Sequence, residues 1–437
     1  MRENKIIRGF SKLTRSEKIN WLIQELNLDK STADFLDSFE LENPEMQSII
    51  TELSENQVSN YHLPFTVAPN FLINGELMTF PLVTEESSVV AALSKAAGYW
   101  AKRGGFHTQI IDTEKKGQVH FKWSGNPEKL KKIFPEIKNQ LLKETAPITQ
   151  NMEKRGGGIR KIELKYLPDI QTEYYQIDVS FETRDAMGAN FINSCLEQMG
   201  KTLRNFIQTR DVFPEEEKKV EIIMAILSNY VPNSRVKVWV ECPVEDLTEN
   251  PLNAQNYVEK FVLAVHISRN DVSRAVTHNK GIFNGMDALA VATGNDYRAI
   301  EAGAHAYAAK DGQYSGLSEA RIENNRFRFE LEIPLAVGVV GGVTALHPLA
   351  KLAMKILQNP SAPELMGYIA TAGLASNWAA VNALVTSGIQ KGHMKMHLSN
   401  ILSQFNLSEE QKVAAKSWFS DKEVSYSAVQ KYIENHG

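Results

Sequence analysis

The spacing of apolar residues divides the first hundred positions into a helical part and a strand-rich part. Apolar positions recur with the helical period over residues 11–26 and 30–41, so we expect the first 50 residues to be mostly helical. Apolar positions then alternate between residues 65 and 81, with turn signals at Pro69-Asn70 and Asn74-Gly75, which is typical of a β-hairpin. A further helix is predicted over residues 87–102.

A second unit begins near residue 105 and has a regular order of elements. The patterns predict a strand, a helix, two strands, a helix and a strand, over residues 118–123, 127–143, 161–167, 175–182, 189–209 and 220–227. This β-α-β-β-α-β order is that of the ferredoxin-like arrangement, an antiparallel sheet with two helices on one face. Because segments of a different pattern lie on both sides, we interpret this unit as an inserted domain.

The rest of the chain mixes strands, expected over residues 235–241 and 260–268, with helices rich in small residues after Gly281 and Asp296. We therefore predict an α+β fold in which a large mixed α/β domain carries the inserted ferredoxin-like domain. We expect N-terminal helices and the first part of the large domain over residues 1–107, and the inserted domain over residues 108–220. The rest of the large domain is expected over residues 221–380, and a mobile helical C-terminal block over residues 381–437.

Length and composition narrow the class of protein. The 437 residues exceed what one hydrophobic core usually organises and suggest two or three domains. Hydrophobic residues make up 43% and charged residues 23%, as in an ordinary soluble globular protein. A net charge of −4 gives no overall basic character of the kind that nucleic-acid-binding proteins show.

Targeting signals and cysteines point to the cytoplasm. The N-terminus lacks the continuous apolar segment of a signal peptide. The longest apolar run, residues 331–350, is interrupted by prolines and glycines, so we expect strand and loop there and no membrane span. Cys195 and Cys242 are the only cysteines and form no C-x-x-C pair. A reduced, cytoplasmic protein without structural zinc or disulfides is the simplest interpretation.

The segment over residues 277–310 holds two candidate functional residues. Lys280 lies in His-Asn-Lys-Gly and Asp296 in Gly-Asn-Asp. We expect each at a glycine-marked break before a helix, where its side chain can project into a cleft. Simpler roles stay open, because Asp296 can cap the helix that begins near Tyr297 and Lys280 can be a solvated turn residue.

A second candidate is the DAMGAN hexad in the turn between a predicted strand and the helix over residues 189–209. Free backbone N–H groups and the helix dipole favour an anionic ligand at such a place. A glycine lets the ligand approach the backbone, and an asparagine offers both a donor and an acceptor, although the same composition also makes a good turn. The candidates are Asp185, Ala186, Met187, Gly188, Ala189 and Asn190.

Two further motifs hold titratable residues. Glu85 and Glu86 precede the helix over residues 87–102, where the dipole alone explains an acidic residue such as Glu85, and Ser88 follows them. Near the C-terminus, His393 and His397 lie four residues apart on one helical face. Such a pair can bind a metal, but no H-E-x-x-H glutamate accompanies it.

The four motifs together resemble those of 3-hydroxy-3-methylglutaryl-CoA (HMG-CoA) reductase, in the soluble class II form of bacteria and archaea, over almost the whole chain. In that family DAMGAN is the nicotinamide-dinucleotide motif, and no G-x-G-x-x-G follows a strand here, so a Rossmann domain is not expected. The resemblance implies four catalytic residues, Glu86, Lys280, Asp296 and His393. It also implies three residues that contact the substrate, Ser88, Arg274 and Asn284.

The resemblance also implies a reaction. HMG-CoA is reduced in two steps through mevaldehyde to mevalonate and CoA by two NAD(P)H, or the reverse, in the mevalonate route to isoprenoids. Lys280 would stabilise the oxyanion, and Asp296 would tune the lysine. Glu86 would donate a proton to the developing alcohol. His393, on a closing C-terminal flap, would protonate the CoA thiolate, and Arg274 would bind the substrate carboxylate. No metal is expected, and the site is expected across the interface of a homodimer or an assembly of dimers.

Departures from the family pattern affect the cofactor and one substrate contact. NADH-using relatives carry an aspartate before the proline upstream of the triple glycine, whereas Ala146 precedes Pro147 here, and Lys154 and Arg155 follow. A missing carboxylate and two added cations suit the 2′-phosphate, so we expect NADPH rather than NADH. Many relatives have glutamine where this chain has Ser376, so that contact is not carried over.

Other classes stay open at this point. A CoA-dependent acyltransferase or lyase could use Lys280, Glu86 and His393 as acid–base groups, but it would not need the DAMGAN turn. A scaffold protein on the same fold would have no reason to hold the catalytic set together. The physiological direction of the reaction also stays open.

Overall fold

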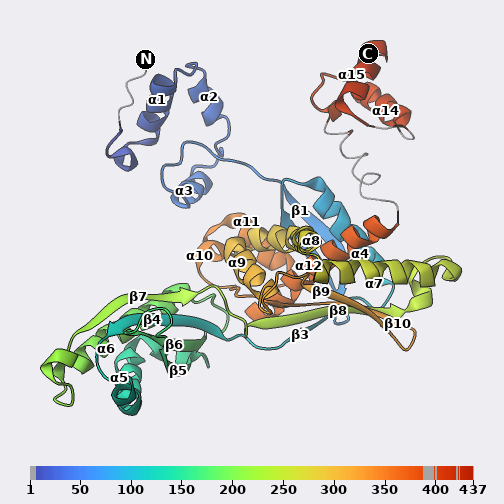
Figure 1. Cartoon of the computed structure of the whole chain (residues 1–437). Coiled ribbons are helices and arrows are strands. Elements are labelled where there is room, and N and C mark those ends of the chain that lie inside the picture. Colours follow the sequence, from blue (N-terminus) through green and yellow to red (C-terminus); the bar gives the residue numbers. More distant parts are fainter. Residues whose placement is uncertain (1–5, 387–397, 399–400, 420–421, 423, 437) are drawn as a thin grey trace.

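The computed structural model describes residues 6–386, 398, 401–419, 422 and 424–436. Helices and three antiparallel sheets make up this part of the chain, which confirms the predicted mixed α/β character (Figure 1). One group of elements surrounds the long helix α12 (Ala362–Val385), and a second group, which contains β4 to β7, lies to one side of it.

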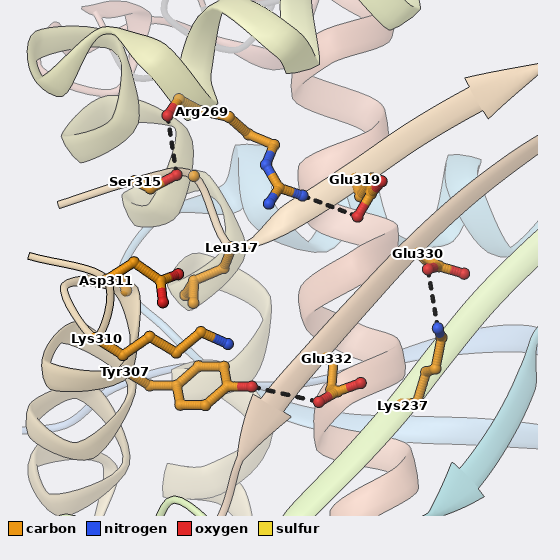
Figure 2. A pocket seen from close by; sticks show the side chains of 12 residues that line it. Lys237, Arg269, Tyr307, Lys310, Asp311, Ser315, Leu317, Glu319, Glu330 and Glu332 are labelled. Carbon is orange, nitrogen blue, oxygen red and sulfur yellow. Dashed lines mark hydrogen bonds and ion pairs between the residues drawn. The ribbon is translucent and has the colours of Figure 1, made fainter. Parts of the chain in front are cut away.

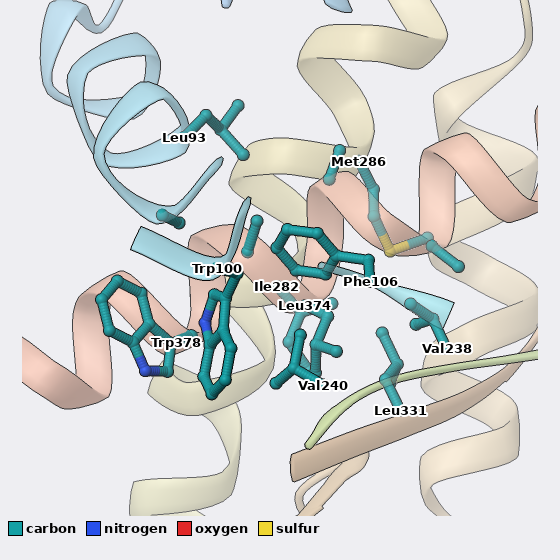
Figure 3. Packing of buried hydrophobic residues seen from close by; sticks show 14 of the residues in the cluster. Leu93, Trp100, Phe106, Val238, Val240, Ile282, Met286, Leu331, Leu374 and Trp378 are labelled. Carbon is teal, nitrogen blue, oxygen red and sulfur yellow. The ribbon is translucent and has the colours of Figure 1, made fainter. Parts of the chain in front are cut away.

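The larger sheet and the helices beside it form the main core. The sheet has the order β3 (His107–Ile110), β8 (Arg235–Pro243), β10 (Arg326–Pro334), β9 (Ser318–Glu323). Fifteen of the 24 residues of α12 are buried, so this helix is enclosed on most sides and not amphipathic. It packs along α8 (Val272–Ala292), and one hydrophobic cluster contains Ile282 and Met286 of α8 together with Leu374 and Trp378 of α12 (Figure 3).

Glycines set the distance between α8 and α12. A Cβ on Gly285 would lie 2.3 Å from the carbonyl oxygen of Ala372, and one on Gly373 would lie 2.7 Å from Cγ of Met286. The helix backbones therefore approach more closely than any larger residue would permit. This crossing fixes the distance between α8 and the buried helix α12.

The predicted hairpin is present as β1 (Phe65–Ile73) and β2 (Glu76–Val83), followed by α4 (Ser87–Ala101). Its turn is Asn74-Gly75, with φ of 49° and 91°, the positive values that a two-residue hairpin turn of type I′ requires. Pro69-Asn70 is not a turn, because the register shifts there within β1 and Asn70 has a φ of 72°.

The smaller sheet has the strand order β5-β6-β4-β7 and its own hydrophobic core. Its elements follow the predicted β-α-β-β-α-β order: β4 (Lys115–Trp123), α5 (Pro127–Glu153), β5 (Gly158–Tyr166), β6 (Tyr174–Glu182), α6 (Ala189–Thr209) and β7 (Val220–Ser228). The helix predicted to end at residue 143 continues for ten more residues, through Pro147. Buried residues at helical spacing, Leu141, Thr145, Thr149 and Met152, offset the backbone hydrogen bond that proline cannot make.

One predicted strand is wrong. Residues 260–268 lie in a helix, α7 (Ala254–Asn270). Its apolar run looks continuous in the sequence, but Tyr257, Val258, Phe261 and Val265 are buried at helical spacing while Leu263 and Ile267 are exposed. The uninterrupted apolar run over residues 261–265 hid this period.

In the described part of the chain, the remaining α-helices lie at the ends of the chain and around the main core. They are α1 (Arg15–Leu26), α2 (Thr32–Asp37), α3 (Pro44–Glu52), α9 (Tyr297–Ala308), α10 (Gly342–Leu346), α11 (Pro348–Ile356), α14 (Glu409–Trp418) and α15 (Tyr426–His436). In Figure 1 the N-terminal helices and α14–α15 lie on the side of the molecule opposite to the smaller sheet. Among the described residues, no helix combines the length and the apolar character needed to cross a membrane.

Candidate active site

Two of the predicted catalytic residues, far apart in the sequence, form an ion pair. Nζ of Lys280 lies 3.7 Å from Oε2 of Glu86. Glu86 is the N-cap residue of α4, with an extended backbone, and its other carboxylate oxygen accepts a hydrogen bond from the Ser88 hydroxyl. The side chains of Lys280 and Glu86 are 65% and 40% exposed, so a ligand can reach both.

The structure corrects the expected setting of Lys280. The residue lies inside the continuous helix α8, not at a break before it, and Gly281 is a helical residue beside α12. A Cβ on Gly281 would have only ordinary contacts, 3.8 Å from Ala380 and 3.9 Å from Asn377. Asn284 follows Lys280 by four residues and therefore lies on the same face of α8. Arg274 lies in the first turn of α8 and is partly exposed.

Asp296 takes the simpler of its two predicted roles within this chain. It is the N-cap residue of α9, and its carboxylate accepts hydrogen bonds from the N–H groups of Arg298 and Ala299. The same carboxylate pairs with the Arg298 guanidinium at 3.1 Å. No ion pair joins Asp296 to Lys280 in the described part of the chain.

The DAMGAN turn connects β6 to α6 and leaves the start of α6 without a side-chain cap. Gly188 is the N-cap residue with a φ of 93°, and a Cβ there would lie 2.4 Å from Thr183 Cγ2. No other residue fits, and the first N–H groups of α6 lack a side-chain acceptor. This end of α6 suits an anionic group by its dipole and its free donors.

Contacts with the main core hold the DAMGAN turn in place. The Asp185 carboxylate accepts a hydrogen bond from the N–H of Ala362, the first residue of α12, and its carbonyl accepts one from Val339 N–H. A Cβ on Gly338 would lie 2.4 Å from the backbone nitrogen of Met187. The Gly338 N–H donates to the Asn295 side chain, next to Asp296. The loop at Gly338 and Val339 thus brings the DAMGAN turn close to the Asp296 turn.

The cations predicted to select the cofactor lie at the end of α5. Lys154 is its C-cap residue and Arg155 follows. Ala146 and Pro147 lie inside α5, beyond residue 143, where this helix was expected to end. The sequence reasoning missed Arg184, whose guanidinium lies over Gly156 of the triple glycine, so that a Cβ there would meet it at 2.5 Å. Its position directly before DAMGAN was the available signal.

A carboxyl pair close to this face was also missed. Asp287 follows Lys280 by seven residues on the same face of α8, and its carboxyl group lies beside that of Glu301 in α9. Burial, and then the Glu301 carboxylate beside it, raise the pKa of Asp287 to about 8. At neutral pH the pair therefore holds a proton.

Two surface cavities lie away from these residues. One of about 240 Å³ lies between the end of α9 and the sheet, and its charged lining is largely paired within the chain, as Lys237 with Glu330 and Arg269 with Glu319 (Figure 2). The other, of about 640 Å³, is lined by His107, Trp239 and several arginines. Among the described residues, no predicted site residue lines either cavity. Among the described residues no three His, Cys, Asp or Glu side chains cluster as metal ligands would.

The structure leaves some predicted residues untested. His393 and His397 lie outside the described residues. Ser376, the departure from the family pattern, is 5% exposed and lies where α12 meets Gly285 of α8, so it is part of the helix crossing.

Comparisons with known proteins agree with the motifs. The family model described as hydroxymethylglutaryl-coenzyme A reductase matches residues 16–398. The chain is 34% identical to the 3-hydroxy-3-methylglutaryl-coenzyme A reductase of Archaeoglobus fulgidus, over 90% of this chain and 86% of that protein. It is 32% identical to a probable enzyme of the same name from Borreliella burgdorferi, over 84% of this chain and 82% of that protein.

A solved structure extends the similarity to the fold. The class II 3-hydroxy-3-methylglutaryl-CoA reductase from Streptococcus pneumoniae, bound to NADPH in open conformations, is 35% identical, with a TM-score of 0.73 over 97% of this chain and 99% of that one. The family match spans most of the chain and includes both residues of the ion pair. The chain belongs to the hydroxymethylglutaryl-coenzyme A reductase family, in its class II form.

Proposed function

We propose that this protein reduces HMG-CoA to mevalonate and CoA through mevaldehyde, with two NADPH per turnover, or runs the reverse reaction. The observation that carries the proposal is the ion pair between Lys280 and Glu86. It places a cation and a carboxyl group within 4 Å of each other on two rigid helices, accessible to a ligand. Reduction of a thioester carbonyl needs both, because negative charge develops on the oxygen and a proton must follow.

Lys280 would stabilise the oxyanion of the hemithioacetal. Its ammonium group is exposed and lies beside the Glu86 carboxylate, on a helix that packs against α12, so it can pair with negative charge on a bound ligand. Asn284, one turn further along the same face of α8, would hold either the ammonium group or the substrate.

Glu86 would deliver the proton to the developing alcohol. Its carboxyl group has one oxygen toward Lys280 and the other bound to Ser88, so its orientation is fixed at both ends. Ser88 would also contact the substrate. Arg274 would bind the substrate carboxylate, since a guanidinium pairs with a carboxylate through two parallel hydrogen bonds. His393 would protonate the CoA thiolate.

Asp296 would act on Lys280 from a second subunit. Its carboxylate is 45% exposed at the start of α9 and unconnected to Lys280 within the described chain. A homodimer with the site at its interface would supply the missing contact. We also propose that the protein is cytoplasmic. The chain would divide into a substrate domain, an inserted nicotinamide domain and a C-terminal flap.

The start of α6 would bind the nicotinamide dinucleotide, which supplies the hydride when bound. The uncapped N–H groups and the absence of a Cβ on Gly188 fit a phosphate group at this place. Lys154 and Arg155 would favour the 2′-phosphate of NADPH, and no acidic residue stands at Ala146 to oppose it.

The acyltransferase or lyase alternative is not favoured by the family match. A direct test is to mix the purified protein with HMG-CoA and NADPH and to follow both nicotinamide absorbance and free thiol. A reductase oxidises NADPH as it releases CoA. Release of CoA without oxidation of NADPH or NADH would support the alternative and contradict the proposal.

A further inference from the structure

The motif that contains Lys280 also contains two buried polar residues that the proposed reaction does not use. His278 and Asn279 are 2% and 0% exposed. Burying such groups is costly unless hydrogen bonds satisfy them, so their partners indicate what they are for.

The partners of His278 connect three elements. Nε2 of His278 lies 2.6 Å from the Ser318 hydroxyl at the start of β9. That hydroxyl donates to Oδ1 of Asn377 in α12 at 2.8 Å, and the Asn377 amide donates back to the carbonyl of His278 at 3.2 Å. With its proton donated to Asn377, the Ser318 hydroxyl can accept a hydrogen bond from Nε2–H of His278. The other ring nitrogen of His278, Nδ1, is buried and has no hydrogen-bond partner among the described residues. All three residues are buried.

Asn279 makes a second connection to the same segment. Its amide donates to the Ser315 carbonyl at 3.0 Å, and its oxygen accepts from the Leu317 N–H at 2.9 Å. Ser315 and Leu317 are seen beside each other in Figure 2, in the segment that leads into β9. One turn of α8 is thus bound by directional contacts to β9, its preceding segment and α12.

These contacts do what the apolar packing cannot. Methyl and methylene contacts along α8 and α12 resist separation of the helices, but they have little directional preference and tolerate small rotations. Hydrogen bonds weaken steeply with angle, so they fix the rotation of α8 about its axis at the turn before Lys280. Lys280 itself has a long flexible stem, and its direction follows from that rotation.

We propose that His278, Ser318 and Asn377 are positioning residues that hold Lys280 beside Glu86. The inference rests on the proposed function, because it concerns the orientation of the proposed catalytic lysine. These residues act through α8 and touch neither substrate nor cofactor. Neutral His278 suits this task, since burial lowers its pKa to about 3, with the Arg274 charge contributing.

Two replacements of His278 separate positioning from packing. His278→Gln keeps a donor where Nε2 stands, whereas His278→Leu fills the buried site without one. The proposal expects kcat for HMG-CoA reduction to fall at least tenfold in His278→Leu, with KM for HMG-CoA and NADPH changed less than threefold, and His278→Gln to stay within threefold of wild type. Equal kcat values in the two variants, whether high or low, would overturn it.

Ser234→Ala is the matched control for Ser318→Ala. Ser234 is also fully buried, and its hydroxyl donates to the Leu335 carbonyl at 2.6 Å, away from Lys280. Ser318→Ala is expected to repeat the loss in kcat, and Ser234→Ala to keep kcat within twofold of wild type. If His278→Leu does not fold by circular dichroism, this pair gives the same answer, and a similar kcat for both serine variants would overturn the proposal.

A chemical readout separates failure of this inference from failure of the proposed function. Acetic anhydride and peptide mass spectrometry give the acylation rate of Lys280, with exposed Lys260 as internal reference. We expect the rate ratio of Lys280 to Lys260 to change at least threefold in His278→Leu and to stay at the wild-type value in His278→Gln. A wild-type protein that does not reduce HMG-CoA would refute the proposed function, while an unchanged ratio in His278→Leu would refute the positioning.

Discussion

At the scale of single residues, the pair formed by Glu86 and Lys280 is the centre of the proposed chemistry. A cation and a carboxyl group 3.7 Å apart on the surface contribute little to stability, since exposed ion pairs are worth about 0–1 kcal/mol. Their arrangement is better explained by a ligand that needs both charges.

Glu86→Gln is expected to remove proton delivery and leave the fold intact. The amide keeps the shape of the side chain and can still accept from Ser88, but it cannot donate the required proton. We expect kcat to fall by about 100- to 10,000-fold, the usual contribution of a general acid, with the melting temperature near that of wild type. Glu85→Gln, next to it at an exposed position, is the matched control and should keep its rate. Equal rates for the two variants would exclude Glu86 as the acid.

Asp287→Asn tests the carboxyl pair through the pH dependence of stability. The folded-state pKa of Asp287 is raised to about 8, so the folded protein holds a proton that the unfolded chain releases near pH 4. The stability that Asp287 contributes is therefore lost as pH rises from about 4 to about 8, whereas an asparagine at this position does not titrate and has no such dependence.

The predicted signature is a difference between two melting curves. The melting temperature of Asp287→Asn relative to wild type should increase from pH 4 to pH 8 and then level off. Asp271→Asn, at the exposed start of α8, serves as control. A difference that does not vary with pH would mean that the carboxyl pair is not protonated in the folded state.

At the scale of elements, the helix crossing and the helix caps decide where the site residues stand. The close approach of α8 and α12 depends on Gly285, whereas the space beside Gly281 is open enough for a methyl group. These two glycines lie one turn apart on one helix and make a matched pair.

Gly285→Ala is expected to destabilise the protein and Gly281→Ala is not. At Gly285 the new methyl group would overlap the Ala372 carbonyl, and overpacking of this kind costs about 1–3 kcal/mol or more. At Gly281 the contacts are ordinary, and alanine favours the helix by roughly 0.5–1 kcal/mol. Urea denaturation measures both, and equal stabilities would contradict the described crossing.

Asp296 has a structural and a proposed catalytic role, and two substitutions separate them. Asn keeps the N-cap hydrogen bonds but not the charge, so Asp296→Asn should retain stability and lose kcat. Asp296→Ala loses the cap as well, at a cost of about 1 kcal/mol. Unfolding and kcat measured on the same samples would show the split. Full activity in Asp296→Asn would leave Asp296 as a helix cap alone.

Elements with a clear period were predictable from the sequence, and the others were not. The helix over 189–209 has the predicted bounds because its apolar face is regular, and the hairpin followed from Asn74-Gly75. The strand predicted over 260–268 was wrong because an uninterrupted apolar run hides its period. Glycine was read as a break at Gly281, although tertiary packing placed it inside a helix.

The site could be predicted only as far as its motifs. The local motif marked Lys280 as a candidate, and the resemblance to the family selected Glu86 and gave both residues their roles. Their approach to 3.7 Å is a long-range contact that no local pattern encodes. Asp287 and Arg184 were missed because their significance lies in partners on other elements, Glu301 and Gly156. The link between the DAMGAN turn and Asn295 through Gly338 was equally hidden.

At the scale of the whole molecule, the two cores divide the proposed work. The main core holds Glu86 and Lys280, and the smaller sheet carries the DAMGAN turn and the cations at the end of α5. Contacts from Val339 and Ala362 to Asp185 join the two parts at the turn. A cofactor bound at the start of α6 would therefore lie at the junction between them.

The cofactor preference should depend on the cations of the smaller part. We expect the double variant Lys154→Ala/Arg155→Ala to raise KM for NADPH by roughly tenfold or more, since charge-assisted hydrogen bonds contribute about 1.5–3 kcal/mol each, and to leave KM for NADH nearly unchanged. Lys131→Ala, at the other end of α5, is the control. An equal effect on both cofactors would place these cations away from the 2′-phosphate.

The stoichiometry of nicotinamide to CoA tests the central claim most directly. Purified wild type and Lys280→Ala are each mixed with HMG-CoA and an excess of NADPH, and absorbance at the nicotinamide band and released thiol are followed together. The proposed function predicts two NADPH oxidised per CoA released by wild type, and no detectable oxidation by a Lys280→Ala protein that folds and binds HMG-CoA normally. Undiminished oxidation in Lys280→Ala, or CoA release by wild type without oxidation, would contradict it.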